Sequence, residues 1–158
     1  MSFGRLRSAL AASTIFALVI AGPALAGGDW NDSGIQWKSY EEGLSEAKAS
    51  KKPVMLVFYT EWCPHCTNYA KLFHDPKLVE LSKKFVMIRI DKDKDAATSG
   101  KYAPDGQYIP RTFFLKSDGT LLADVTEQRP QYKYFYDEND PASVMRSMNA
   151  VLAMPAQS

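Results

Sequence analysis

The chain's two cysteines lie close together in the run Trp62-Cys63-Pro64-His65-Cys66. A close pair of thiols can form and break a disulfide, and so store and release two electrons. If a helix begins at Cys63, residues three positions apart share one face, with the side chains about 5 to 6 Å apart, within the range that a disulfide spans. The spacing therefore predicts a redox-active pair.

The residues around the pair favour ionisation of the first sulfur. A helix N-terminus presents unpaired N–H groups and a positive partial charge, which stabilise a thiolate at Cys63. His65 adds a positive charge when protonated, and Pro64 suits a first helical turn because the N–H that it lacks has no partner there. Since only about 3% of an ordinary thiol is ionised at pH 7, such stabilisation turns a thiol into a nucleophile and a good leaving group.

Other interpretations of the pair are less well supported. A disulfide that closes so short a loop removes little unfolded-state entropy, so it would be a poor structural cross-link. Zinc as a rule takes four ligands, and the candidates are the two cysteines with His65 and His74. Covalent haem requires His directly after the second Cys, where this chain has Thr67. We expect no metal and no bound cofactor, because electrons move through the cysteines themselves.

The elements around the pair alternate between strands and helices. The apolar run Val54–Tyr59 is bounded by a proline and a polar turn, which is typical of a central strand buried on both faces. A helix is expected from Cys63 to about Phe73, and Asp75-Pro76 has the N-cap pattern of another that runs to Lys84. The remaining elements of this half are a short strand at 35–37, a helix from the Ser39/Glu42 capping box toward Lys51, and a strand at 85–91.

The second half supplies a loop, a hairpin and a final helix. The polar stretch 92–109 is expected to be an irregular connection, of a length that is often functional. Strands at 111–116 and 120–124, joined by a turn that contains Gly119, predict an antiparallel hairpin. Asp140-Pro141 caps a last amphipathic helix. This order predicts an α/β fold with a central mixed sheet flanked by helices.

Composition and the first residues indicate one exported domain. Of 158 residues, 46% are hydrophobic, and 19 basic residues face 18 acidic ones, so a nucleic-acid partner is not expected. Two arginines precede an apolar run at 9–21 that is shorter than the about 20 residues needed to span a bilayer, and Ala24-Leu25-Ala26 follows. We predict a signal peptide at 1–26, cleaved after Ala26, and a domain at 27–158 that is periplasmic or secreted.

The chain resembles the thioredoxin superfamily over nearly all of residues 27–158. The likeness is carried by the strand Val54–Tyr59, by the cysteine run with Glu61 before it, and by Ile109-Pro110-Arg111 before a hairpin. The segments 102–111 and 132–136 are similar to the small anterior-gradient proteins of the secretory pathway. Pro64-His65 between the cysteines is similar to the periplasmic disulfide-donating enzymes of DsbA type. The resemblance implies a thioredoxin fold and thiol-disulfide exchange with protein substrates.

The resemblance also implies roles for the cysteine run. Cys63 would be the nucleophile that forms a mixed disulfide with substrate, and Cys66 would be the more buried resolving thiol. Pro64 and His65 would tune the redox potential. Trp62 would shield the sulfurs and offer substrate an apolar contact.

Three further positions bear on substrate. Pro110 matches the family's cis-proline, which packs against the cysteines and leaves a backbone edge at Ile109 for an extended substrate peptide. Arg111 either bonds local carbonyls or meets substrate. The aromatic segment Tyr132–Tyr136 fits an edge strand that covers the core better than a substrate-facing patch.

Two positions depart from ordinary thioredoxins. Val57 stands where the family has a buried Asp that assists the resolving thiol, and Met87 stands where it has a nearby Lys. Glu61 is an alternative proton acceptor, although a Glu beside a Trp is more often simply exposed to solvent. The loss of the internal acid–base pair favours an oxidant or a general exchange enzyme over a cytosolic-type reductase.

The sequence thus predicts an exported thiol-disulfide oxidoreductase that oxidises or exchanges protein disulfides. Two alternatives stay open: a periplasmic reductase supplied with electrons by a membrane partner, and a non-enzymatic binding or chaperone module that uses the peptide groove alone. The expected partners are proteins with thiols or disulfides and a redox partner protein. The chain is expected to be a monomer.

Overall fold

The computed structural model describes residues 27–155, so the predicted signal peptide lies outside the described residues. One four-stranded sheet has the order β1-β3-β2-β4, with β1, β3 and β2 parallel and β4 antiparallel to β2. The strands are β1 (Trp37–Lys38), β2 (Val54–Tyr59), β3 (Val86–Asp91) and β4 (Arg111–Leu115). The helices are α1 (Tyr40–Ser50), α2 (Pro64–Lys71), α3 (Pro76–Ser82), α4 (Ala96–Lys101) and α5 (Pro141–Ala153), with a 3₁₀ turn η1 (Leu72–His74).

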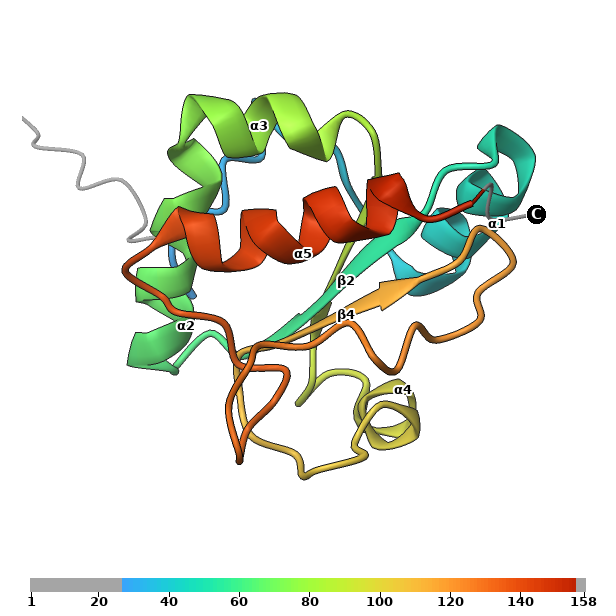
Figure 1. Ribbon diagram of the computed structural model, residues 1–158. Helices are drawn as coiled ribbons and strands as arrows, with labels where there is room; N and C mark the ends of the chain where they lie inside the picture. Colours follow the sequence, from blue (N-terminus) through green and yellow to red (C-terminus); the bar gives the residue numbers. More distant parts are fainter. Residues whose placement is uncertain (1–26, 156–158) are drawn as a thin grey trace, which may run out of the picture.

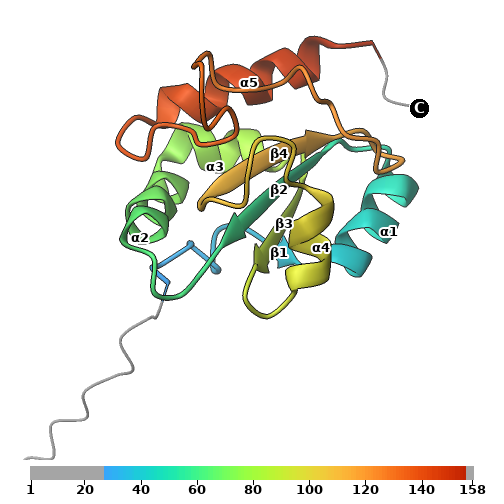
Figure 2. The same ribbon diagram turned by 90° about the horizontal axis from the view of Figure 1, so that it is seen from below.

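Helices cover both faces of this sheet, as the sequence predicts. Figures 1 and 2 show α2, α3 and α5 on one face and α1 and α4 on the other. Strand β2 lies between β3 and β4 and feeds both cores, because successive side chains of a strand point to opposite faces. Val54, Leu56 and Phe58 enter the core under α1, whereas Met55 and Val57 enter the core that holds the two cysteines.

Two helix starts have the local structure that their sequences predict. The Asp75 carboxylate accepts hydrogen bonds from two backbone N–H groups at the start of α3, and the Asp140 carboxylate accepts one at the start of α5. A proline follows each cap, and caps of this kind stabilise a helix by about 1 kcal/mol. The helix ends differ slightly from prediction, since α3 ends at Ser82 and α2 at Lys71, where the chain tightens into η1.

The second half of the chain corrects three predictions. The stretch 92–109 contains helix α4, whose N-cap Asp95 accepts from the Thr98 N–H at 3.0 Å. The strand predicted at 120–124 is a single bridge between Leu115 and Leu121, because the chain turns away after one pair. The segment 132–136 is no edge strand, since Tyr132 has a φ of 53° and interrupts an extended backbone.

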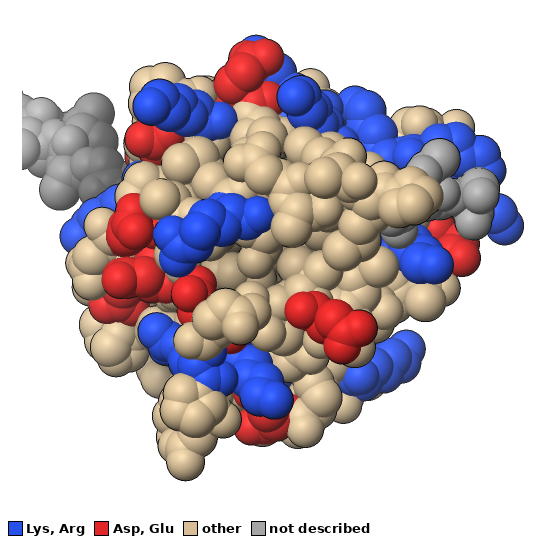
Figure 3. Space-filling view, viewed as in Figure 1, with Lys and Arg blue, Asp and Glu red and all other residues tan. Residues whose placement is uncertain are grey.

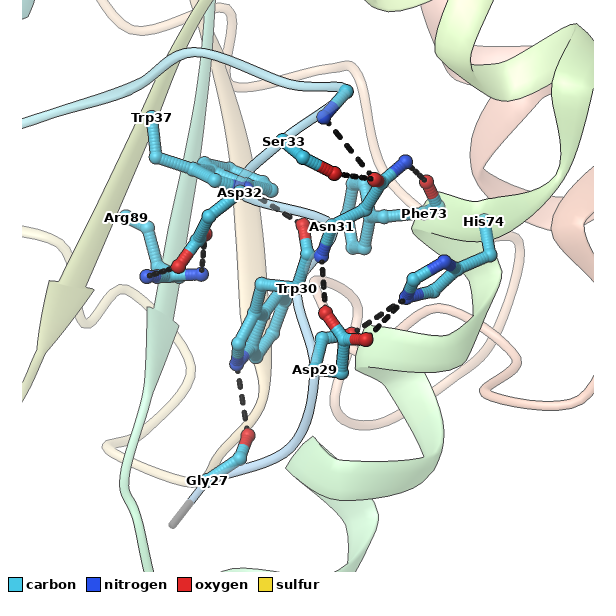
Figure 4. A network of polar contacts seen from close by, with 11 residues as sticks. Gly27, Asp29, Trp30, Asn31, Asp32, Ser33, Trp37, Phe73, His74 and Arg89 are labelled. Atoms are coloured by element: carbon cyan, nitrogen blue, oxygen red, sulfur yellow. Dashed lines mark hydrogen bonds and ion pairs between the residues drawn. The ribbon is translucent and has the colours of Figure 1, made fainter. Parts of the chain in front are cut away.

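The polar lead before β1 is a packed part of the fold, as Figure 4 shows. Trp30 is buried, and its indole N–H donates to the Gly27 carbonyl at 2.8 Å. The Arg89 guanidinium lies over the ring of Trp30 at 5.4 Å and pairs with Asp32 at 2.9 Å. Gly28 has a φ of 89°, and a Cβ there would come within 3.0 Å of α2. The lead therefore buttresses the helix that follows the cysteines.

Candidate active site

Strands β2 and β4 bring the two parts of the predicted site together. Because they are antiparallel, the carboxyl end of β2 lies beside the start of β4, with Phe58 opposite Arg111. Cys63 comes soon after β2, and the Ile109–Pro110 peptide, which is cis as the resemblance implied, comes just before β4. The Cys63 sulfur lies 4.0 Å from the Ile109 carbonyl oxygen. The fold thus unites residues that are far apart in sequence.

Cys63 is the N-cap of α2, one position before the helix itself. Pro64 occupies the first helical turn, and the Cys66 backbone N–H donates to the Cys63 sulfur at 3.3 Å. This hydrogen bond and the positive partial charge of the helix N-terminus both favour negative charge on that sulfur. The local backbone therefore provides the electrostatic environment of a nucleophilic cysteine.

The two cysteines are both free thiols, and they differ in environment. Cys63 is 3% exposed and Cys66 is fully buried. Burial raises the pKa of the Cys66 thiol far above its ordinary value, and its hydrogen bond with Cys63 raises it further, against a backbone hydrogen bond from Thr60 that lowers it. Both effects favour the protonated form of the Cys66 thiol, an asymmetry that suits a nucleophile and a resolving thiol.

His65 has a carboxylate partner that the sequence analysis did not find. Its Nδ1 lies 2.8 Å from one oxygen of Glu138, in the segment before α5, and its ring meets the Phe135 ring edge-on. Asn68, one turn along α2, donates to the same carboxylate at 3.2 Å. No local pattern could reveal a contact between residues 73 positions apart.

Trp62 is an exposed side chain held in a fixed orientation. It is 68% exposed, and its indole N–H donates to the Asp93 carboxylate at 2.8 Å. Asp93 lies in the turn that follows β3, which the sequence predicts to be a solvated turn. The indole face is therefore presented to solvent directly before Cys63, where it can contact another molecule.

The positions that replace the family's acid–base pair are apolar and buried. Val57 and Met87 lie in the same core cluster as both cysteines. Glu61, the alternative proton acceptor, points away from this core to an exposed ion pair with Lys94. The Thr60 hydroxyl is buried and has no hydrogen-bond partner within residues 27–155.

The residues left open by the sequence find structural places. Arg111 is fully buried and donates to the Gly106 carbonyl at 2.7 Å and the Ser99 hydroxyl at 2.6 Å, so it bonds local groups. Tyr134 and Tyr136 are buried in the two cores, as the core interpretation of this segment predicts. Within residues 27–155, no cluster of three metal-ligating side chains occurs, and no helix is long and apolar enough to cross a membrane.

Known proteins are similar to this chain in sequence and in fold. A model of the thioredoxin-like family matches residues 36–117. The human anterior gradient protein 2 homolog is 32% identical over 126 residues, which cover 79% of this chain and 70% of that protein.

Two solved structures have the same fold. A thioredoxin from Thermus thermophilus has a TM-score of 0.57 at 20% identity, covering 76% of this chain and 88% of its own. A structure described as DsbH oxidoreductase has a TM-score of 0.57 at 19% identity, covering 89% and 96%. By its sequence, its mixed sheet and the place of its cysteine pair, this chain belongs to the thioredoxin-like family.

Proposed function

We propose that this chain is an exported thiol-disulfide oxidoreductase that exchanges disulfides with protein substrates through Cys63 and Cys66, preferentially as an oxidant or in disulfide exchange. One observation carries the proposal: the Cys63 sulfur accepts a backbone hydrogen bond at the start of α2 and lies 4.0 Å from the Ile109 carbonyl oxygen, with the buried Cys66 thiol next to it in the same turn. The pattern at 1–26 supports export. Proteins with accessible thiols or disulfides are the proposed substrates.

The chemistry uses the two sulfurs in order. In the oxidising direction, a substrate thiolate attacks the Cys63 sulfur of the Cys63–Cys66 disulfide, and Cys66 leaves as a thiolate that takes up a proton. A second substrate thiolate attacks the substrate sulfur of the mixed disulfide and releases Cys63. The substrate loses two electrons and two protons, and the cysteine pair gains them.

The residues around the sulfurs suit substrate binding. The Ile109 carbonyl lies 4.0 Å from the Cys63 sulfur, Pro110 follows it in the chain, and the exposed Trp62 directly precedes Cys63. We propose that the edge at Ile109 pairs with an extended substrate peptide. His65 and Pro64 are proposed to set the redox potential from the first turn of α2.

The test uses the oxidised protein and a synthetic peptide that contains two cysteines. Wild type should convert the peptide to its disulfide, whereas Cys63→Ser and Cys66→Ser should not. With an oxidised peptide, Cys66→Ser should accumulate a mixed disulfide that Cys63→Ser cannot form, so the two variants serve as matched controls. Peptide oxidation by wild type that is no faster than with Cys63→Ser would reject the enzyme and leave a binding or chaperone module.

The pairing of His65 with Glu138 favours a second candidate, a reductase supplied by a membrane electron donor. A carboxylate beside the histidine offsets the positive charge that makes a cysteine pair oxidising. Equilibration of the pair with glutathione separates the two directions. A potential near that of thioredoxin, about −270 mV, would contradict the oxidant and support the reductase.

A further inference from the structure

Among the described residues, Glu138 is the carboxylate from the segment before α5 that contacts the Cys63–Cys66 loop, through His65, and the next turn of α2, through Asn68. It is held at two points on α2, by His65 and by Asn68, and its side chain is only 12% exposed. In Figure 3, acidic side chains gather at the end of the molecule where α5 begins. Because two residues of α2 hold it, the Glu138 carboxylate keeps one position near the cysteine pair, unlike the carboxylate of a mobile surface side chain.

We propose that Glu138 is a positioning residue for His65 that offsets its charge at the cysteine pair and thereby makes the pair less oxidising. The inference deepens the proposed function and rests on it. The cysteine run alone does not show this, because Glu138 comes from a distant segment of the chain.

The effect of a nearby charge on the redox potential follows from the proton and electron balance of the cysteine pair. Reduction of the Cys63–Cys66 disulfide takes up two electrons and two protons, and one proton is released again wherever Cys63 remains a thiolate. A positive charge nearby stabilises that thiolate, so it favours the reduced pair and raises the potential. An imidazolium bound to a carboxylate has no net charge, so its effect on the sulfur is reduced.

The Glu138 charge also acts on the buried thiol. It is the smallest of the causes that raise the pKa of Cys66, after burial, the hydrogen bond with Cys63 and the charge of Cys63. Two cations lie near this network: the Arg129 guanidinium lies over the Phe135 ring at 5.6 Å, and the Lys71 ammonium donates to Asn68 at 2.9 Å. The carboxylate that contacts the imidazole directly is Glu138.

The decisive variant is Glu138→Gln, which keeps the shape of the side chain and removes its charge. The measurement is the equilibrium of the cysteine pair with glutathione, made at the same pH for every variant. We expect Glu138→Gln to shift the equilibrium toward the reduced pair by about three- to tenfold, about 15 to 30 mV, since exposure of His65 lets solvent screen part of the charge. The equilibrium is approached from both the oxidised and the reduced protein.

Asp137→Asn, His65→Ala and the double variant His65→Ala/Glu138→Gln separate the charge from a general structural effect. Asp137→Asn removes the neighbouring exposed carboxylate, whose partner among the described residues is the Asn139 N–H, and should leave the equilibrium unchanged. In a His65→Ala background, Glu138→Gln should lose most of its effect. An unchanged equilibrium in Glu138→Gln, a shift toward the oxidised pair, or an equal shift without His65 would each overturn the proposal.

Failure of the proposed function has a different signature. A wild-type protein whose cysteines do not exchange with glutathione refutes the oxidoreductase itself. A wild type that exchanges normally, together with an unresponsive Glu138→Gln, refutes only the role of Glu138.

Discussion

Replacement of Trp30 by alanine tests whether the polar lead is part of the folded core. Trp30 is 3% exposed, and its ring packs against Trp37, Tyr59 and Phe73 with centroids 5.2 to 5.8 Å away. Removing a buried Trp side chain costs about 3 to 5 kcal/mol, because apolar contacts are lost and a cavity remains. Against a typical domain stability of about 5 to 15 kcal/mol, this is a large fraction.

The free energy of unfolding in urea, followed by far-ultraviolet circular dichroism, measures this loss without relying on tryptophan fluorescence. Trp30→Phe keeps a ring but removes the donor to the Gly27 carbonyl, so it should cost about 1 to 2 kcal/mol beyond the change in packing. Trp62→Ala is the matched control, because Trp62 is mostly exposed and should change stability by about 0.5 kcal/mol or less. A loss in Trp30→Ala as small as that in Trp62→Ala would refute the reasoning.

Three further predictions concern single side chains near the site. In the reduced protein at pH 7, iodoacetamide should label Cys63 well before Cys66, as peptide mass spectrometry can measure, because burial raises the pKa of the Cys66 thiol and shields it; faster labelling of Cys66 would contradict this. Arg111→Ala should lower the free energy of unfolding by about 3 kcal/mol or more, since it opens a cavity beside Phe58 and leaves buried acceptors unpaired; a loss below about 1 kcal/mol would argue against it. Hydrogen bonds from Trp62 and Lys92 lower the pKa of Asp93, so the Trp62–Asp93 contact should persist at and above the ordinary Asp pKa of about 3.9. The contact should be lost as the pH falls below that value, and the Trp62 fluorescence should change with it. Asp93→Asn should abolish this change in fluorescence.

The strands and caps could be predicted because their signals are local. The run Val54–Tyr59 is apolar at every position, and only a strand buried on both faces accommodates six such residues in this way. Asp75 and Asp140 each precede a proline, and in both places the carboxylate satisfies backbone N–H groups of the first turn. In these three places the signal lies in a few neighbouring residues, and the structure has the predicted element there.

Elements without such a signal were missed. Helix α4 has six residues, among them Ser99 and Gly100, and too few apolar positions to display a helical period, so it depends on its Asp95 cap and on Tyr102 packing below it. The bridge at Leu121 has one pair instead of a ladder, which alternation of residue types cannot distinguish from a strand. Short elements of this kind are fixed by tertiary packing.

The candidate site divides in the same manner. The cysteines and the start of α2 lie within four consecutive residues, so the proposed redox pair is visible in sequence. Glu138 is visible only after folding, because its segment follows β4 and returns to α2 before α5 begins. The sequence therefore predicts the pair, but not the charge that we propose adjusts its redox potential.

The burial of the residues around the cysteine pair determines where a substitution can add or remove a charge. Buried Val57 and Met87 leave the interior below the cysteines without a charge, and placing one there would incur the cost of burying it in a packed core. The His65 side chain is 60% exposed, and its partner Glu138 lies in an irregular segment. A substitution that changes the charge of either residue would therefore disturb the core little. The redox potential of this domain is therefore expected to be adjusted from the solvent side of α2, while the sheet beneath the sulfurs stays apolar.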